Sequence, residues 1–300
     1  MNIGITTTMP LTNDYVGVHG ITMFMFPLIK KFKEHNHNIH FYGKVMNNPQ
    51  KNIFCECLKL KPYDMSVEKD ISSINNFSTL NSLDALLVYP RFPEVKDEFI
   101  FQNNIIKNAS RNKIFIGLWD GDLQAQYIPK KLREKSTLLR PYVSTKFDNL
   151  FKNAFLFDYF THPEGFQTSE NKVIDYIYIG NQYKRFDEFK KQFENLQGNV
   201  VVGGNWLKNE EKTLNSIQLK NVLYIGDVPH NMALPLYGTS RNTFYIIPKE
   251  YQEVGMITSR VYEAEMAECN ILNNPFPTNH KLNTVGNAYQ QFIELQGGRK

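Results

Sequence analysis

The stretch "DALLVYPRFPEVKDEFIFQNNIIKNASRNKIFIGLW", residues 84–119, predicts the fold class of this chain. It contains two short apolar runs, 84–90 and 113–119, separated by a polar and amphipathic segment. Short runs of β-forming residues that alternate with helical segments are typical of parallel strands in α/β proteins. We therefore expect a parallel sheet with helices on both faces.

The same alternation occurs in two series along the chain. The first series also contains "NIGITTT" and "NIHFYG", and the second contains "VIDYIYIG", "NVVVGG", "NVLYIG", "TFYIIP" and "NILNN". A polar stretch with Gly and Pro at 161–172 separates them and predicts a domain boundary. We expect Rossmann-like domains over residues 1–168 and 169–283, with a final helix at about 284–297 that can pack back on the first domain.

The composition is that of a globular chain with a modest positive charge. Hydrophobic residues make up 42% and charged residues 21%, and no apolar run reaches the roughly 18 residues of a membrane span. The start "MNIGITTT" lacks the features of a signal peptide, so we expect a cytoplasmic protein. A net charge of +4 is compatible with DNA as a partner, although it is weaker than that of a dedicated DNA-binding domain. Cys55, Cys57 and Cys269 have no metal-type spacing, so we interpret them as inert thiols.

Ligands of parallel sheets bind at the carboxyl ends of the strands, where two carboxylates follow the run 113–119. Asp120 or Asp122 can remove a proton from a substrate hydroxyl or help to hold a divalent ion. Asp-Gly-Asp is also ordinary turn chemistry. We favour Asp122 slightly as the general base, but nothing in the sequence separates the two aspartates.

The first half contains two further candidate groups. Gly17 and Gly20 precede a predicted helix, where glycines let backbone amides approach a phosphate, and His19 between them either touches substrate or caps the loop. Arg91 and Arg140 flank prolines or aromatic residues and are candidates for contacts with an anionic acceptor such as DNA. The alternative for both arginines is a surface ion pair, which we favour for Arg140.

The second half carries cations, glycines, amides, an aromatic residue and a carboxylate after its strands. In sequence order these candidates are Asn181, Arg185, Gly204, Asn205, Trp206, Gly255, Ser259, Arg260 and Glu263. Cations and glycine-freed amides suit a diphosphate, a carboxylate accepts ribose hydroxyls, and an aromatic ring stacks on a base. Arg260 and Glu263 lie three positions apart on one helix face, where a simple salt bridge is the alternative. Together these residues predict a nucleotide-sugar site.

The stretch "TSRVYEAEMAECNIL", residues 258–272, resembles a helix and strand of glycosyltransferases with the GT-B architecture. That family has two facing Rossmann-like domains with a cleft between them. The resemblance implies that Glu263 holds the donor ribose and Arg260 faces the diphosphate. It also implies that the loop 255–259 supplies backbone amides to phosphate, with Arg185 as a second phosphate contact.

Other motifs qualify the resemblance. The Gly-x-x-Gly loop at 17–20 is similar to the GT-B loop that faces donor phosphate and acceptor. Many retaining members carry a glutamate eight positions before the ribose-binding one, where this chain has Gly255, so the anomeric outcome stays open. Asp120-x-Asp122 resembles the metal motif of GT-A enzymes, but the late Arg and Glu favour GT-B. We therefore expect no dedicated metal site, with Mg or Mn at these two aspartates as the alternative.

The length, basic pI and N-terminus are similar to those of bacteriophage enzymes that glycosylate modified pyrimidines in DNA. This resemblance implies a monomeric hexosyltransferase that moves a sugar from UDP-glucose to 5-hydroxymethylpyrimidine in double-stranded DNA, in the host cytoplasm. One alternative is a glycosyltransferase of surface polysaccharide or glycoprotein synthesis. A second, of another class, is a non-catalytic nucleotide-sugar-binding protein. A Rossmann oxidoreductase is disfavoured because no GxGxxG follows the first strand.

Overall fold

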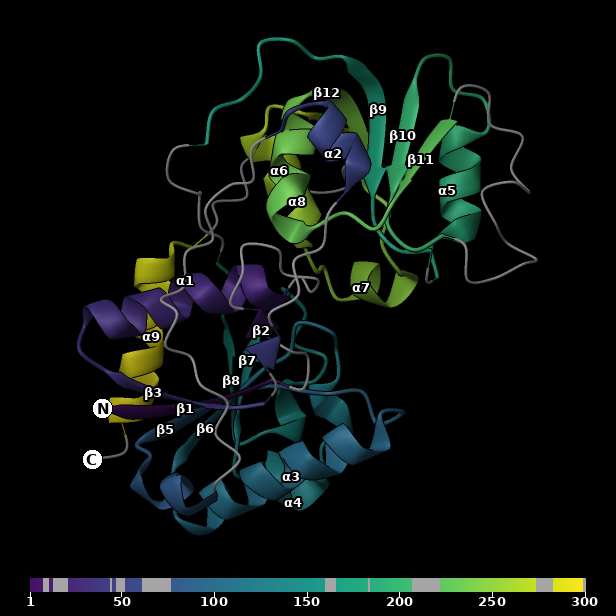
Figure 1. Cartoon of the computed structure of the whole chain (residues 1–300). Helices are drawn as coiled ribbons and strands as arrows, with labels where there is room; N and C mark the ends of the chain where they lie inside the picture. The colour runs from purple at the N-terminus through teal and green to yellow at the C-terminus, as the bar shows by residue number, and fades with distance from the viewer. Residues whose placement is uncertain are drawn as a thin grey trace.

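The chain forms two parallel β-sheets, one from each half of the sequence (Figure 1). The computed structural model describes residues 1–7, 11–12, 21–43, 45–46, 52–60, 77–159, 166–182, 184–206, 222–273 and 283–298. In both sheets, every strand pair that these residues form is parallel, as expected when helices connect successive strands. The predicted α/β class with two Rossmann-like units is confirmed.

The first sheet has six strands in the order β3-β1-β5-β6-β7-β8. Its strands are β1 (Asn2–Thr7), β3 (Asn38–Tyr42), β5 (Ala85–Tyr89), β6 (Phe115–Trp119), β7 (Thr137–Arg140) and β8 (Asn153–Leu156). The sequence analysis did not identify β7 and β8. A separate pair joins β2 (Leu11–Thr12) to β4 (Val45–Met46). Strands β5 and β6 are buried along their whole length because helices cover both faces of the sheet.

Two pairs of helices cover this sheet (Figure 1). They are α1 (Ile21–Glu34) and α9 (Val285–Gly297) on one face, and α3 (Lys96–Arg111) and α4 (Lys130–Arg133) on the other. The C-terminal helix α9 returns to this sheet, because the ring of Phe292 packs 5.2 Å from that of Phe32 and 5.6 Å from that of Phe115. The two ends of the chain consequently lie on the same side of the molecule.

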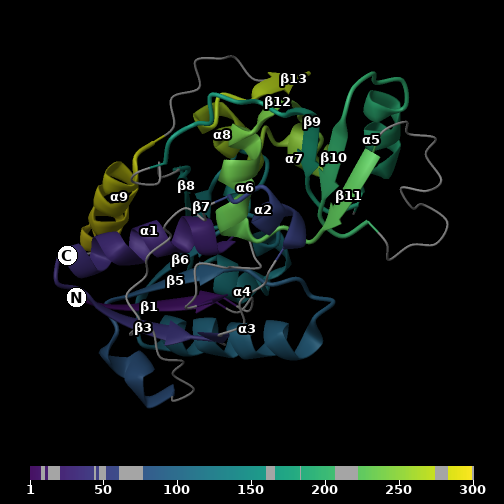
Figure 2. The same cartoon turned by 45° about the horizontal axis from the view of Figure 1, so that its top comes forward.

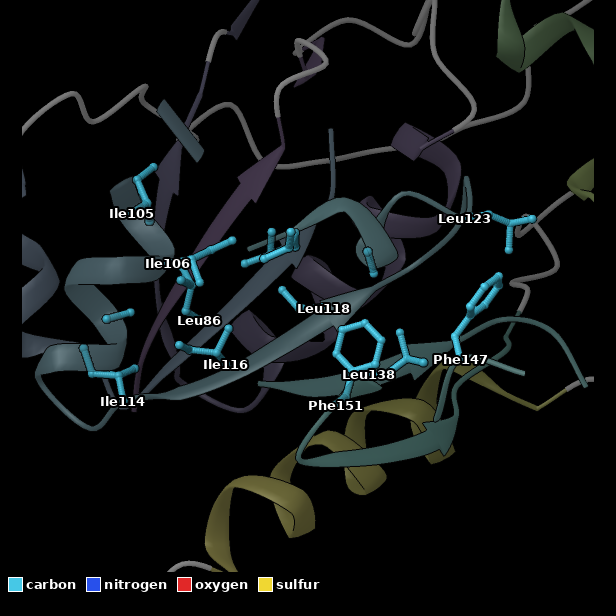
Figure 3. Close-up of a cluster of buried hydrophobic side chains, with 14 of the residues drawn as sticks. Leu86, Ile105, Ile106, Ile114, Ile116, Leu118, Leu123, Leu138, Phe147 and Phe151 are labelled. Carbon is cyan, nitrogen blue, oxygen red and sulfur yellow. The ribbon is translucent and has the colours of Figure 1, made fainter. Parts of the chain in front are cut away.

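The core between α3 and the first sheet extends to the loop that follows β6. Ile105 and Ile106 of α3 pack with strand residues such as Leu86 and Leu138, and Leu123 lies at one end of the same cluster (Figure 3). A buried Leu123 anchors the short loop that carries the two candidate aspartates. The core therefore positions that part of the site.

The second sheet has five strands in the order β11-β10-β9-β12-β13. Its strands are β9 (Ile174–Ile179), β10 (Val200–Gly203), β11 (Val222–Gly226), β12 (Ser240–Phe244) and β13 (Asn270–Leu272). Its helices are α5 (Phe186–Phe193), α6 (His230–Gly238), α7 (Lys249–Glu253) and α8 (Ser259–Met266). Helix α5 covers one face while α6 and α8 cover the other, and α7 lies on the side that faces the first sheet (Figures 1 and 2).

Helix α2 (Ile53–Cys57) departs from the expected division at residue 168. It lies beside α6 and α8 in both views (Figures 1 and 2), and Cys55 is buried in the core of the second half. Asn52 ties this helix to the loop after β11, because its side-chain amide donates to the carbonyls of Ile225 and Asp227 at 2.8 and 2.9 Å. A single boundary in the sequence therefore does not describe the packing of residues 52–60.

None of the helices that the described residues form combines the length and the hydropathy needed to cross a membrane.

Candidate active site

A cleft of about 600 Å³ lies between the carboxyl ends of the two sheets. Loops after strands of both halves line it, as expected for doubly wound sheets, whose ligands bind where strand order reverses. The predicted site residues on its wall are Asp122, Asn181, Arg185, Gly204, Asn205, Ser259 and Arg260. One cleft thus brings together residues from the two sequence series.

Asp122 is on the cleft wall contributed by the first half. Its Oδ1 accepts a hydrogen bond from the Tyr251 hydroxyl at 3.0 Å, and the Tyr89 hydroxyl also donates to the carboxylate. Burial raises the pKa of Asp122, whereas these two hydroxyls and the charges of Arg91 and Arg185 oppose that rise. The side chain is therefore a cleft-facing carboxylate of perturbed basicity, which is the property a general base requires.

Asp120, the other predicted catalytic aspartate, lies beneath the cleft. It is 1% exposed, and its two oxygens accept hydrogen bonds from the Ala125 amide at 2.8 Å and the Tyr142 hydroxyl at 2.9 Å. Burial raises its pKa to about 6 against these bonds. Asp120 does not line the cleft, and its hydrogen bonds hold the loop in place.

The backbone of the loop separates the two carboxylates. Leu123 has a φ of +58°, in the left-handed region that leucine seldom adopts. This turn places the Leu123 side chain in the hydrophobic cluster between α3 and the first sheet (Figure 3). Asp120 consequently points inward and Asp122 lines the cleft, a distinction that the residue types do not contain.

The ends of β9 and β10 approach each other closely at Gly204. Its φ is +113°, and a Cβ on it would lie 2.2 Å from the carbonyl oxygen of Gly180. Only glycine fits this position without displacing the strand end. Next to it, the Asn205 amide donates to Asn181 Oδ1 at 3.0 Å. These contacts build a compact polar surface on the side of the cleft that the second half contributes.

Trp206 does not have the predicted base-stacking position. It is fully buried, packs against Tyr178 and Phe189, and donates its indole N–H to the Gly180 carbonyl at 2.7 Å. An aromatic ring just after a strand can turn into the core beside α5, where it buries more apolar surface than it would in the cleft. Trp206 therefore supports the floor of the site from below.

Arg185 and Arg260 bring positive charge to the cleft from two helices. Arg185 precedes the first residue of α5, and its Nη1 donates to the Asn181 carbonyl at 3.0 Å. Arg260 lies in the first turn of α8, where the leading backbone amides have no intrahelical acceptor. The guanidinium groups and the amide end of α8 give this wall an anion-binding character.

Glu263 lies three positions after Arg260 on α8 and forms an ion pair with it. Its Oε2 accepts from Arg260 Nη1 at 2.6 Å, whereas its Oε1 is buried and has no hydrogen-bond partner among the residues that the structure describes. Burial raises the pKa of Glu263, and the guanidinium opposes this rise. A buried carboxylate oxygen without a donor is costly unless a ligand hydroxyl or another donor reaches it.

Gly255, a predicted donor contact, is not among the residues that line the cleft. It has a φ of +66° and ends α7, with its own amide bonded to the Gln252 carbonyl and the Met256 amide bonded to the Tyr251 carbonyl. This pair of bonds is the Schellman arrangement, which uses two of the amides of the loop 255–259, those of Gly255 and Met256. Ser259 lies on the cleft wall at the start of α8.

The two arginines predicted to bind an acceptor are both paired within the first half. Arg91 Nε lies 3.0 Å from Glu98 Oε2, and Arg140 Nε lies 3.0 Å from Asp148 Oδ1. Arg140 also donates to the carbonyls of Tyr142 and Val143 at 2.9 and 3.1 Å. The ion-pair interpretation therefore fits both side chains, and Arg140 holds the loop after β7.

Two further predictions concern the glycine loop at 17–20 and a metal site. Gly17, His19 and Gly20 lie outside the described residues. Among the residues that the structure describes, no three His, Cys, Asp or Glu side chains form a group that could hold a metal ion. The two oxygens of Asp120 accept hydrogen bonds from Ala125 and Tyr142, and Asp122 lines the cleft.

The sequence analysis missed much of the aromatic wall. Tyr89, Trp119 and Tyr159 line the cleft from the first half, as does the carboxylate Asp158. The rings of Trp119 and Tyr159 stack with centroids 5.7 Å apart. Asp158 could have been predicted from the apolar run "NAFLF" at 153–157, because the residue that follows the carboxyl end of a parallel strand lies at the ligand-binding edge of the sheet.

Comparisons of sequence find no match for this chain, whereas comparisons of structure do. No protein-family model matches the sequence, and no curated protein matches it. A structure of T4 phage β-glucosyltransferase is 16% identical, with 99% of this chain and 89% of that chain covered at a TM-score of 0.58. An α-glucosyltransferase in complex with UDP and a 13-mer DNA is 11% identical, with 100% and 91% covered at a TM-score of 0.55.

A UDP-GlcNAc 2-epimerase from Neisseria meningitidis, bound to UDP-GlcNAc, has the same architecture. It is 12% identical, and the match covers 100% of both chains at a TM-score of 0.51. The T4 enzyme has also been solved with UDP-glucose and with UDP and Mn²⁺. These likenesses confirm the expected GT-B fold. Transferases and an epimerase share it, so the reaction must be argued from the site.

Proposed function

We propose that this chain is a glycosyltransferase that binds a UDP-sugar, UDP-glucose, in the cleft and transfers the sugar to an acceptor hydroxyl. One observation carries the proposal: the cleft has Arg185 and Arg260 on one wall and the carboxylate of Asp122 on the other. A leaving diphosphate needs cations, and an acceptor hydroxyl needs a base. Both kinds of group are present in a single site.

The donor is assigned to the second half, over residues 169–283. Arg185, Arg260 and the first-turn amides of α8 surround the diphosphate, and Ser259 lies beside it. The unpartnered Oε1 of Glu263 accepts a ribose hydroxyl when the donor enters. Gly204 lets the β9 and β10 ends lie close enough together to form the floor under the donor, next to Asn181 and Asn205.

The acceptor is assigned to the first half, over residues 1–168, with Asp122 as the base. Asp122 takes the proton of the acceptor hydroxyl as that oxygen forms a bond to the anomeric carbon. The bond from this carbon to the diphosphate oxygen breaks, and UDP leaves with the bonding electron pair. We assign attack on the side opposite the leaving group, which inverts the anomeric centre.

No divalent metal is assigned to a site held by the protein alone. The two oxygens of Asp120 accept hydrogen bonds from Ala125 and Tyr142, and the described residues contain no cluster of three ligands. The charge of the diphosphate is therefore assigned to the arginines, and no step is routed through a metal.

The favoured acceptor is 5-hydroxymethylpyrimidine in double-stranded DNA, in the cytoplasm of a phage-infected host. The net charge of +4 and the likeness to glucosyltransferases of DNA support this choice. The hydroxymethyl base must leave the helix to reach Asp122, which lines the cleft. The alternative acceptors are a surface glycan or a glycoprotein.

Release of UDP from UDP-glucose tests the proposal, with unmodified duplex DNA and with duplexes that contain 5-hydroxymethylcytosine or 5-hydroxymethyluracil. We expect release that depends on a hydroxymethyl base, together with a mass gain of one hexose on the DNA. Release with glycan acceptors alone would keep the transferase and replace the acceptor. An altered sugar without transfer, as an epimerase would produce, or UDP binding without turnover would overturn the proposal.

A further inference from the structure

The Asp122 carboxylate is held by tyrosine hydroxyls from both halves of the molecule. Tyr89 is the last residue of β5 and donates from the same half as Asp122. Tyr251 lies on α7 in the second half and donates to Oδ1 at 3.0 Å. Two donors fix the orientation of the carboxylate more closely than one, and one of them depends on how the halves are docked.

Helix α7 is itself docked on the first half. Val254 and Met256 are buried in the core cluster beside β6 and β7, and Tyr251 packs against the same cluster. The chain after α7 pairs with the loop after β7, because the Ser144 amide donates to the Val254 carbonyl at 3.0 Å and Met256 forms a β-bridge with Tyr142. Helix α7 lies on the side of the second sheet that faces the first sheet (Figure 1), and its Tyr251 reaches Asp122 from there.

The same segment leads directly to the proposed donor contacts. Tyr251 is followed by the Gly255 turn and then by α8, whose second residue is Arg260. On the other side of α7, Glu250 forms an ion pair with Lys184, next to Arg185 in the sequence. The hydroxyl that holds the base and the guanidinium groups that face the diphosphate therefore lie on one connected substructure.

We propose that Tyr251 is a positioning residue that aims the Asp122 carboxylate at the acceptor hydroxyl and links this orientation to docking of the donor-binding half on the first half. The inference rests on the proposed function, because it assigns a role beside the proposed base. Tyr251 touches neither reacting atom and acts through Asp122.

The charge state of Asp122 provides a readout that packing alone would not change. The titratable and charged groups that face it are Tyr89, Arg91, Asp120, Arg185 and Tyr251. A hydroxyl that donates to a carboxylate favours the charged form and lowers the pKa. Removing the Tyr251 hydroxyl therefore raises the pKa of Asp122, and the acidic limb of the rate profile moves to higher pH.

Tyr251→Phe tests this role because it removes one oxygen and keeps the ring. Tyr42→Phe is the matched control, since Tyr42 is 1% exposed and its hydroxyl bonds Thr79 at 2.7 Å, outside the residues that line the cleft. For UDP release from UDP-glucose, we expect Tyr251→Phe to lower kcat about tenfold with KM for the donor within about twofold of wild type. The acidic limb moves upward only in this variant, and both variants keep a cooperative melting transition.

A Tyr251→Phe variant with the kcat and acidic limb of Tyr42→Phe would overturn the positioning role, as would a loss that appears only in KM. Asp122→Asn separates this failure from that of the proposed function. If the wild type releases UDP, Asp122→Asn is inactive and Tyr251→Phe behaves like the control, then only the role of Tyr251 is wrong. If the wild type releases no UDP with any acceptor, both proposals are wrong.

Discussion

Replacing Gly204 by alanine tests whether the close approach of β9 and β10 forms the floor of the donor site. The added Cβ would lie 2.2 Å from the Gly180 carbonyl oxygen and 2.7 Å from its carbonyl carbon. Both atoms are backbone, so no flexible side chain can move aside. The carbonyl, which also accepts the Trp206 indole N–H, would have to shift by about 1 Å to restore an ordinary contact.

The cost has two parts. Alanine at a φ of +113° is strained by about 1–3 kcal/mol, and the displaced strand end adds an overpacking cost of similar size. Together we expect the free energy of unfolding to fall by roughly 2–6 kcal/mol, which lowers Tm by roughly 3–10 °C for a chain of 300 residues. Because Asn181 follows Gly180 on the cleft wall, a shift of about 1 Å should weaken UDP binding by about 10- to 100-fold.

Calorimetry of unfolding and titration with UDP measure both effects. Gly226→Ala is the matched control, since Gly226 also has a positive φ, +71°, but a Cβ there would meet nothing within 4 Å. We expect it to lose only about 1–2 kcal/mol of stability and to keep its UDP affinity. A Gly204→Ala variant that melts and binds UDP like Gly226→Ala would refute the reasoning.

Four other substitutions give distinct expectations. Trp206→Phe should lower the free energy of unfolding by about 2 kcal/mol in urea denaturation and leave the UDP Kd unchanged, whereas a stacking role would weaken UDP binding. Asp122→Asn should reduce UDP release about 10²- to 10⁴-fold and retain UDP affinity. The rate of the wild type should fall as pH drops through the pKa of Asp122, which burial raises above 3.8. A flat pH profile of the wild type would contradict the assignment of Asp122 as the base. Asp120→Asn should keep turnover. In the wild type, the raised pKa of Asp120 contributes stability that is fully present below pH 3.8, and about 3 kcal/mol of the free energy of unfolding is lost as pH rises through 6. The variant should lack this pH dependence of stability. Arg260→Ala should weaken UDP binding about 10- to 100-fold, because it removes a diphosphate contact and leaves Glu263 buried without its cation. Wild-type affinity in a titration with UDP would argue against the donor assignment.

The fold was predictable because local apolar patterns decide it. Runs such as 84–90 and 113–119 are buried on both faces, so they read as parallel strands even in a single sequence. The strands β7 and β8 are only four residues each and were missed, because so short a run has no clear period. Helix α2 could not be assigned to the second half, since its partners are far away in the sequence.

The candidate site was predictable in position more than in detail. Residues after strands, such as Asn181 and Asn205, line the cleft because parallel strands end at one edge. Which way a side chain turns within a loop depends on backbone geometry, as at Leu123, and on local packing, as at Trp206. The contact between Tyr251 and Asp122 joins segments 129 positions apart, so no local pattern indicates it.

A crystal structure of the protein with UDP would locate the donor relative to the arginines and Asp122. We expect the diphosphate between Arg185 and Arg260, and a ribose hydroxyl within hydrogen-bond distance of Glu263 Oε1. We also expect the Asp122 carboxylate to face the open space next to the diphosphate. UDP bound elsewhere, or bound in the cleft with the diphosphate away from both arginines, would overturn the donor assignment.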